Sequence, residues 1–156
     1  EDIKLLIHKA TDIMDDLKQS VVKDAEYFYP LLQAFKLPRD TDAQKAFREK
    51  EIQEALKGAC QVPLEVAQSC LEAIILHKEY AEKGNRMAIS DIGVGTALCK
   101  AALKGAKLNL FINTNMIKDE NIKKELEENM LAIEKQAFEM ADQIILEIEN
   151  HLMGRE

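Results

Sequence analysis

Apolar residues recur at steps of three and four along most of the chain, which is the spacing of one face of an α-helix. Over residues 3–35 this pattern predicts one long amphipathic helix. The apolar face consists of Leu6, Ile13, Leu17, Val21, Phe28, Leu31 and Leu32. Leu37-Pro38 ends this helix, because the residue before a proline is pushed out of the α region.

Turn and capping residues predict where the next two helices begin and end. Thr41 and Gln44 have the spacing of a capping box, so a second helix begins there and runs to about Cys60. Pro63 suits the first turn of a third helix, where its missing N–H is harmless. We expect this helix to stop at Gly84 in a left-handed C-terminal cap.

A fourth helix, capped by Ser90 or Asp91, is expected to have an unusually small face. Its small residues are Gly93, Gly95, Ala97, Ala101, Ala102, Gly105 and Ala106. Glycine costs about 1 kcal/mol inside a helix, so this face indicates close helix packing, or else close approach to a ligand. Residues 108–114 form the one strand-like run, which is too short to anchor a sheet.

Asp119 begins the last predicted helix, whose apolar positions keep the same helical steps. They are Leu126, Met130, Ile133, Ala137, Met140, Ile144 and Ile148. This seam predicts packing within a helical bundle, or across a subunit interface. The predicted fold class is therefore all-α, a bundle of long antiparallel helices in a single domain spanning residues 1–156.

Composition excludes some classes of protein. Hydrophobic residues make up 47% and charged residues 31% of the chain, an ordinary globular balance. The net charge of −7 argues against a nucleic-acid partner, because phosphate binding requires a basic face. Three cysteines without a Cys-x-x-Cys pair fit reduced thiols, so we expect a cytoplasmic protein. No apolar run approaches the roughly 20 residues that span a bilayer, so no membrane partner is expected.

The usual metal and nucleophile motifs are absent from the sequence. His8, His77 and His151 lie far apart and outside any ligand spacing, so we expect no metal site. Gly93-Val94-Gly95 lacks the preceding strand and the third glycine of a phosphate loop.

Asp24 lies among apolar residues of the first helix. An exposed carboxylate on the polar face is the simpler interpretation. A buried Asp24 would instead have a raised pKa and could hold a proton near neutral pH, as a general acid must.

Two other polar groups have both a local and a functional interpretation. The first group occupies helix boundaries, where turn and cap roles compete with ligand binding; it consists of Asn85, Ser90, Asp91, Asn109 and Asn113. The second group flanks the first predicted turn and consists of Lys36, Arg39 and Arg48. It is either a solvated charge cluster or a site that binds a carboxylate of the ligand.

A series of short segments follows the order and spacing of one enzyme family. They are Lys23-Asp24-Ala25-Glu26-x-Phe28, Lys36-Leu37-Pro38, Arg48, Ile52-Gln53-x-Ala55-Leu56, Val62-Pro63-Leu64, Gly84-Asn85, Ser90-Asp91-Ile92-Gly93-Val94, Gly105-Ala106-x-Leu108-Asn109 and Ile112-Asn113. Over about residues 22–119 the chain resembles the cyclodeaminase domain of formimidoyltransferase-cyclodeaminase and the stand-alone methenyltetrahydrofolate cyclohydrolases.

The resemblance implies an all-helical domain that forms a homodimer and that forms or opens 5,10-methenyltetrahydrofolate. A cyclodeaminase closes 5-formimidoyltetrahydrofolate with loss of ammonia, whereas a cyclohydrolase adds water to give 10-formyltetrahydrofolate. The proton-donating aspartate of the family falls on Asp24. No cofactor is expected beyond the tetrahydrofolate substrate, which can be polyglutamylated.

The remaining substrate-binding residues are expected from charge and from the matching motifs. The glutamate tail of folate is anionic and suits the basic cluster, while the polar boundary residues would bind the rest of the molecule. The expected set is Lys36, Arg39, Arg48, Asn85, Ser90, Asp91, Asn109 and Asn113.

One departure from the family pattern concerns the start of the chain. The family has a helical segment with a Pro-rich, glycine-rich, Ser-containing loop before the position of Glu1, and we expect this domain to lack it. The alternative to an enzyme is a non-enzymatic helical interaction module that pairs through the final helix.

Overall fold

The computed structural model describes residues 3–155, and the described residues are almost entirely helical. The helices are α1 (Ile3–Lys36), α2 (Asp42–Ala59), α3 (Gln61–Lys83), the short 3₁₀ helix η1 (Arg86–Ala88), α4 (Ile89–Thr114) and α5 (Glu120–Leu152). Within residues 3–155 there is no strand, so the predicted all-α class is confirmed.

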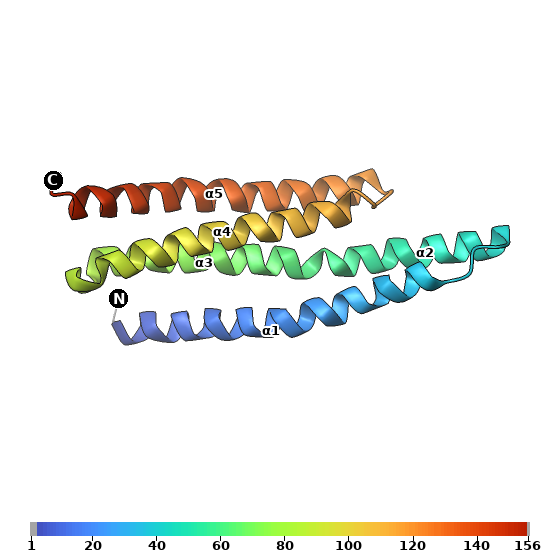
Figure 1. Ribbon diagram of the computed structural model, residues 1–156, viewed down its shortest axis with the longest axis horizontal. Helices are drawn as coiled ribbons and strands as arrows, with labels where there is room; N and C mark the ends of the chain where they lie inside the picture. The colour runs from blue at the N-terminus through green and yellow to red at the C-terminus, as the bar shows by residue number, and fades with distance from the viewer. Residues whose placement is uncertain (1–2, 156) are drawn as a thin grey trace.

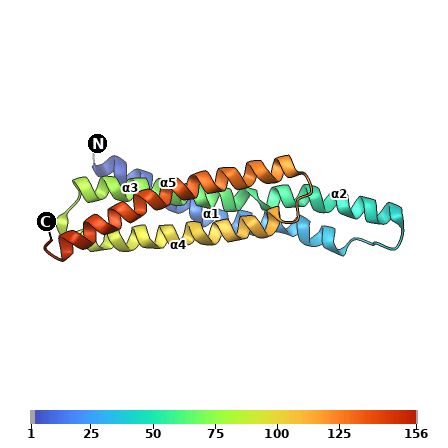
Figure 2. The same cartoon turned by 90° about the horizontal axis from the view of Figure 1, so that it is seen from above.

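The long helices form an up-and-down bundle of antiparallel rods. α2 and α3 follow one another as one nearly continuous rod, and successive rods run in opposite directions (Figure 1). α3 is central, because it packs against α1, α4 and α5. The two chain ends lie at the same end of the bundle, and the hairpin of α1 and α2 projects beyond the far ends of α4 and α5 (Figure 2).

The core is formed by one apolar stripe from each long helix. The last helix supplies Met130, Ile133, Ala137, Ile144 and Ile148, all buried in this core. Leu126 and Met140 pack against it while partly buried. The predicted seam is thus confirmed as bundle packing within the chain.

Charged side chains also join α4 to α5. The Glu134 carboxylate accepts hydrogen bonds from Lys104 Nζ at 3.1 Å and Lys107 Nζ at 2.6 Å. Lys100 pairs with Asp142 in the same way, and its ammonium lies 4.8 Å from the ring centre of Phe138. All three lysines of the middle of α4 therefore lie on the side that faces α5.

Two predicted helix starts are confirmed by their capping bonds. Thr41 Oγ1 accepts from the Gln44 backbone N–H at 3.2 Å, and Gln44 Oε1 accepts from the Thr41 N–H at 3.0 Å. Asp119 Oδ1 accepts from the N–H groups of Asn121 and Ile122. Each cap satisfies donors that the first turn of a helix leaves free.

The boundary between α3 and α4 differs from the prediction. Gly84 has φ −84° and ψ −179°, so it is extended, and the predicted left-handed cap is wrong. A Cβ at Gly84 would lie 2.4 Å from the Tyr80 carbonyl oxygen, so glycine is required for close approach instead. Ser90 and Asp91 do not cap α4: the capping side chain is Asn85, whose Oδ1 accepts from Met87 N–H at the start of η1.

The strand-like run 108–114 is the last part of α4. Its buried residues Leu110, Asn113 and Thr114 fall on one helical face, and this tertiary burial overrides the local preference for strand. The glycines earlier in α4 permit close packing: a Cβ at Gly93 would lie 3.3 Å from Ile148 Cγ2, and one at Gly95 would lie 2.6 Å from His77 Nε2.

One stretch within Asp42–Lys83 is long and apolar enough to cross a membrane by length and composition, contrary to the expectation from the sequence. Half of that stretch is buried inside the bundle. The central helix of a bundle passes the same test, so this finding is weak support for a membrane span.

Candidate functional site

A groove beside Asp24 brings together α1, the first turn of α3 and the second half of α4. Its volume is about 460 Å³, and a smaller cavity of about 200 Å³ continues it toward the end of α4. We call the two together the Asp24 groove. It is lined by Leu17, Ser20, Val21, Asp24, Phe28, Ala59, Val62, Pro63, Val66, Ala102, Gly105, Ala106, Asn109, Ile112 and Asn113.

Within the described chain, Asp24 is the one ionisable side chain that lines this groove. It stands at the edge between apolar residues of α1, and it is exposed. The condition for a buried general acid is therefore not met in a single copy. Asn109 also lines both cavities, from α4, so its amide and the Asp24 carboxylate belong to the same groove.

The floor of the groove is fixed by a hydrogen bond between helices. Pro63 lies in the first turn of α3 and has no N–H for the carbonyl four residues earlier, which belongs to Ala59. Asn113 Nδ2 donates to that carbonyl at 3.0 Å. The Asn113 side chain is only 8% exposed, so its amide holds α4 against the α2–α3 junction at the base of the groove.

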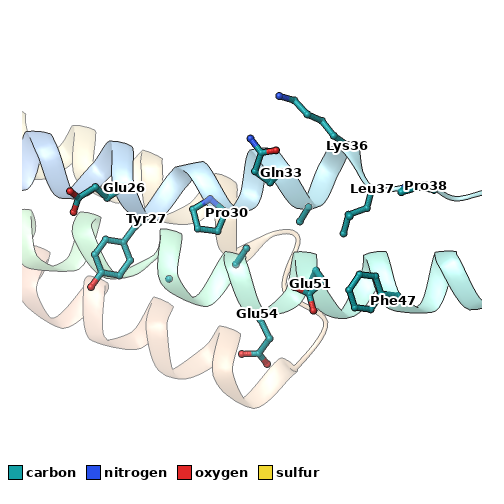
Figure 3. Close-up of a pocket in the computed structure, with 13 residues that line it drawn as sticks. Glu26, Tyr27, Pro30, Gln33, Lys36, Leu37, Pro38, Phe47, Glu51 and Glu54 are labelled. Atoms are coloured by element: carbon teal, nitrogen blue, oxygen red, sulfur yellow. The ribbon is translucent and has the colours of Figure 1, made fainter.

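The three predicted basic residues do not form a basic pocket. Lys36 lies on the rim of a second groove, of about 860 Å³, between α1 and α2. Its side chain extends away from α2 (Figure 3), and the carboxylates of this groove come from Glu26, Glu51 and Glu54. Arg39 is exposed in the turn between the helices.

Arg48 is held by the end of α1. Its Nη2 donates to the Phe35 carbonyl at 3.2 Å, and its guanidinium lies 6.0 Å from the Phe35 ring centre. Its Nε is buried and finds no hydrogen-bond partner among residues 3–155. In this position Arg48 joins α1 to α2 and does not point into the Asp24 groove.

The remaining predicted residues lie at the other end of α4. Asn85 caps η1, and Ser90 and Asp91 are exposed in the first turn of α4. Asn109 follows Asp91 by 18 residues, which corresponds to about 27 Å along a helix. Of the predicted set, the structure thus brings together Asp24, Asn109 and Asn113. The basic residues and the polar residues around the start of α4 lie apart from them.

A model of the formiminotransferase-cyclodeaminase family matches residues 1–132. The chain belongs to this family. It is 39% identical over 118 residues to the methenyltetrahydrofolate cyclohydrolase of Methylorubrum extorquens, covering 76% of this chain and 57% of that protein. It is 34% identical over 119 residues to the formimidoyltransferase-cyclodeaminase of Gallus gallus, covering 76% of this chain and 21% of that protein.

A solved structure of the same family has the same fold. The formiminotetrahydrofolate cyclodeaminase of Thermotoga maritima superposes with a TM-score of 0.79 and 26% sequence identity. The match covers 91% of this chain and 67% of the Thermotoga chain. Among the two relatives compared by sequence, the chain spans little more than half of the length of the cyclohydrolase and about a fifth of the length of the Gallus protein. The resemblance drawn from the sequence motifs is confirmed.

Sequence patterns alone missed part of the groove of this family member. Ala59 and Val66 line it but carry no polar signal, and Pro63 was interpreted as a helix-start residue and as part of a family motif, with no place in the site. The sequence offered one signal for this part of the groove: Pro63 has no N–H, so the carbonyl four residues earlier must accept a hydrogen bond from another donor. The donor itself, Asn113, is 50 residues away in the sequence, and only the bundle places it there.

Proposed function

We propose that this chain carries out one-carbon chemistry on a reduced folate, forming or opening 5,10-methenyltetrahydrofolate, with Asp24 as the proton donor. The observation that carries the proposal is the Asp24 groove, which is lined by the carboxylate that the family resemblance selects and by the Asn109 amide, on a largely apolar floor. Family membership supports the same chemistry, since one relative is named as a methenyltetrahydrofolate cyclohydrolase and another as a formimidoyltransferase-cyclodeaminase.

The chemistry of ring closure fits one carboxyl group at the edge of an apolar groove. N10 of 5-formimidoyltetrahydrofolate attacks the formimidoyl carbon and loses its proton, while the C–N bond to the amine breaks. The amine leaves as ammonia after it gains a proton, which the Asp24 carboxyl donates. Positioned acid catalysis of this kind contributes about 10²–10⁴-fold to the rate. In the cyclohydrolase reaction a water molecule bonds to the methenyl carbon and gives one proton to the same carboxylate. The bond from that carbon to N5 then breaks as the proton passes to N5, and the remaining hydroxyl proton leaves to solvent.

The other predicted residues have separate roles in this proposal. The Asn109 amide can donate to and accept from the polar edge of the substrate, and Asn113 positions the floor. Lys36 follows Asp24 by 12 residues, about 18 Å along α1, so it can meet an anionic tail that leaves the groove. Arg39 and Arg48 stay predictions for a polyglutamate tail, since Arg39 is exposed in the turn between α1 and α2 and Arg48 is held by the Phe35 carbonyl.

Three predicted residues lie too far from the groove in one copy to touch the same substrate. Asn85, Ser90 and Asp91 stay predictions, since their place near the opposite end of α4 gives no contact with Asp24. The resemblance also supports a homodimer as the working form, and the three cysteines without a Cys-x-x-Cys pair support a cytoplasmic location. A non-enzymatic module is not favoured, because the relatives and the fold neighbour are named as enzymes.

The direct test is incubation of the protein with each of the two substrates. With 5-formimidoyltetrahydrofolate a cyclodeaminase raises the absorbance of the methenyl product, and with 5,10-methenyltetrahydrofolate a cyclohydrolase lowers it. Absence of enzyme-dependent change with both substrates would refute the proposal. Thermal melting with a reduced folate adds a readout of binding, because a ligand that binds only the folded state must raise Tm.

A further inference from the structure

The groove between α1 and α2 is separate from the Asp24 groove and belongs to a single helical hairpin. Its volume is about 860 Å³, and its lining residues come from α1, α2 and the start of the turn between them. No residue of α3, α4 or α5 within the described chain lines it, and the hairpin projects beyond the far ends of α4 and α5 (Figure 2). We call this space the hairpin groove.

The walls of the hairpin groove are two apolar stripes, one from each helix. The stripe on α1 consists of Tyr27, Pro30, Ala34 and Leu37, and the stripe on α2 consists of Phe47, Ala55 and Gly58. Each set has the spacing of one helical face. The α1 stripe extends over about 15 Å, nearly three helical turns, so the groove is long enough to hold a short helix.

Aromatic rings stand toward opposite ends of the hairpin groove (Figure 3). At one end the Tyr27 ring packs on Gly58, where an added Cβ would lie 3.4 Å from Tyr27 Cδ1. At the other end Phe47 is 56% exposed. An aromatic side chain left exposed in a concave wall is typical of an anchor point for a partner.

The charged groups of the hairpin groove are mostly carboxylates. Glu26 lines it from α1, and Glu51 and Glu54 line it from α2. In the described chain neither Glu26 nor Glu51 forms an ion pair, and Glu54 has an exposed pair with Lys57 at 2.8 Å. The lysine at the rim, Lys36, extends away from α2 (Figure 3). The groove therefore presents negative charge that its own chain leaves largely uncompensated.

Pro30 adds a further acceptor to the α1 wall. It lies inside α1 and has no N–H, so the Glu26 carbonyl four residues earlier lacks its helical donor. A proline ring lies against that carbonyl, and since Pro30 lines the groove, the carbonyl opens toward the same side. An acceptor without its helical donor favours a ligand that carries N–H groups.

We propose that the hairpin groove binds a basic amphipathic helix of a partner protein. The apolar face of that helix lies on the two stripes, with apolar anchors at i, i+3, i+4 and i+7, which is the helix-in-groove mode of recognition. Its lysine or arginine side chains pair with Glu26, Glu51 and Glu54. An arginine can also donate to the Glu26 carbonyl, because a guanidinium has five N–H donors.

The charge of the hairpin groove disfavours other occupants. Like charges that face one another across an interface repel, so an anionic folate tail, a nucleic acid and a second copy of this chain, with its net charge of −7, are all unfavourable. A small organic cation would pair with the carboxylates but would leave most of the two apolar stripes uncovered. A helix with one apolar and one basic face satisfies both features at once.

The test is titration of a fluorescently labelled synthetic peptide with the whole chain, followed by anisotropy. The peptide is a helix of about four turns, with leucine at i, i+3, i+4 and i+7 and arginine at the flanking positions. It should bind saturably to the wild-type chain. The same peptide with glutamate in place of every arginine should not bind, because its charges would face those of the groove.

Variants of the chain separate the groove from the overall charge. Glu51→Lys combined with Glu54→Lys should weaken binding of the basic peptide by at least about tenfold, and Phe47→Ser by at least about fivefold. The matched control, Glu125→Lys combined with Glu139→Lys, changes the net charge equally at exposed positions of α5 and should keep Kd within about twofold. Helical circular dichroism should be the same for all variants, because each substituted side chain is exposed or half-buried.

Three results would overturn this proposal. The first is the absence of saturable binding up to about 1 mM chain, where an association is already very weak. The second is an equal loss of binding in the groove variant and the α5 control, which would show a response to net charge alone. The third is displacement of the peptide by spermine at an equal concentration of positive charge, which would make the occupant a small cation. None of these readouts requires turnover, and neither Asp24 nor Asn109 lines this groove, so the outcome is separate from that of the proposed function.

Discussion

Pro63 and Asn113 solve one hydrogen-bonding problem between them. Proline at position 63 leaves the Ala59 carbonyl without its helical donor, and the Asn113 amide supplies one from α4. A buried carbonyl without a partner costs about 1–3 kcal/mol. The proline and the asparagine are therefore expected to depend on each other.

This dependence predicts the outcome of a double-mutant cycle measured by urea unfolding. Asn113→Leu should lower the free energy of unfolding by about 1–3 kcal/mol, because the Ala59 carbonyl then stays buried and unpaired. Adding Pro63→Ala restores a backbone N–H and should recover at least half of that loss. Additive effects of the two substitutions would show that the bond does not couple them.

His77 predicts a pH dependence of stability. Burial lowers the pKa of His77, and its Nδ1 is buried without a hydrogen-bond partner among residues 3–155. Below about pH 6.5 the unfolded chain takes up a proton on this side chain that the folded chain does not yet bind. Its contribution to stability is therefore fully present above pH 6.5 and is lost as the pH falls toward the lowered pKa.

Urea unfolding between pH 5 and pH 7 measures this effect. His77→Gln should flatten the fall in unfolding free energy relative to wild type. His8→Gln is the control, because His8 is exposed on α1, and it should leave the slope unchanged. An equal slope in wild type and His77→Gln would contradict the assignment to His77.

At the scale of elements, helical periodicity predicted more than local propensity did. The capping box at Thr41 and the cap at Asp119 placed two helix starts correctly because side-chain capping bonds are local. Residues 108–114 were described as strand-like because local propensity ignores the burial of Leu110 and Asn113. The role predicted for Gly84 was wrong because glycine is favoured both in a left-handed helix cap and where two backbone segments come close together. The sequence does not show which of the two conditions holds, since that depends on the backbone conformation after α3.

The glycines of α4 give a prediction at this scale. Gly95→Ala should destabilise the bundle, because its Cβ would lie 2.6 Å from the Nε2 of half-buried His77. Gly105→Ala meets no atom within 4 Å, and it should stabilise one copy by about 0.5–1 kcal/mol through helix propensity. Thermal melts at low protein concentration compare the two. Equal effects of the two substitutions would contradict the packing role of Gly95.

At the scale of the whole molecule, the site depends on the relative register of three helices. Asp24 was singled out by the family motif, since periodicity alone indicates an exposed acid, and the structure does place it on the surface of one copy. Its neighbours Asn109 and Asn113 are more than 80 residues away in the sequence. Their meeting follows from how α1 and α4 pack on α3, and no local pattern contains that information. The predicted basic residues lie instead at the hairpin of α1 and α2, where Arg48 is held by the Phe35 carbonyl, and none of them lines the Asp24 groove.

The measurement that tests the central claim most directly is turnover by Asp24→Asn beside Asp15→Asn. Asp15 is an exposed carboxylate on the same helix, paired with Lys18 at 2.8 Å. With the substrate that the wild type turns over, Asp24→Asn should lose about 10²–10⁴-fold in kcat, with unchanged helical circular dichroism. Asp15→Asn should keep the wild-type rate of change in methenyl absorbance. Wild-type turnover by Asp24→Asn would contradict the claim that this carboxyl donates the proton.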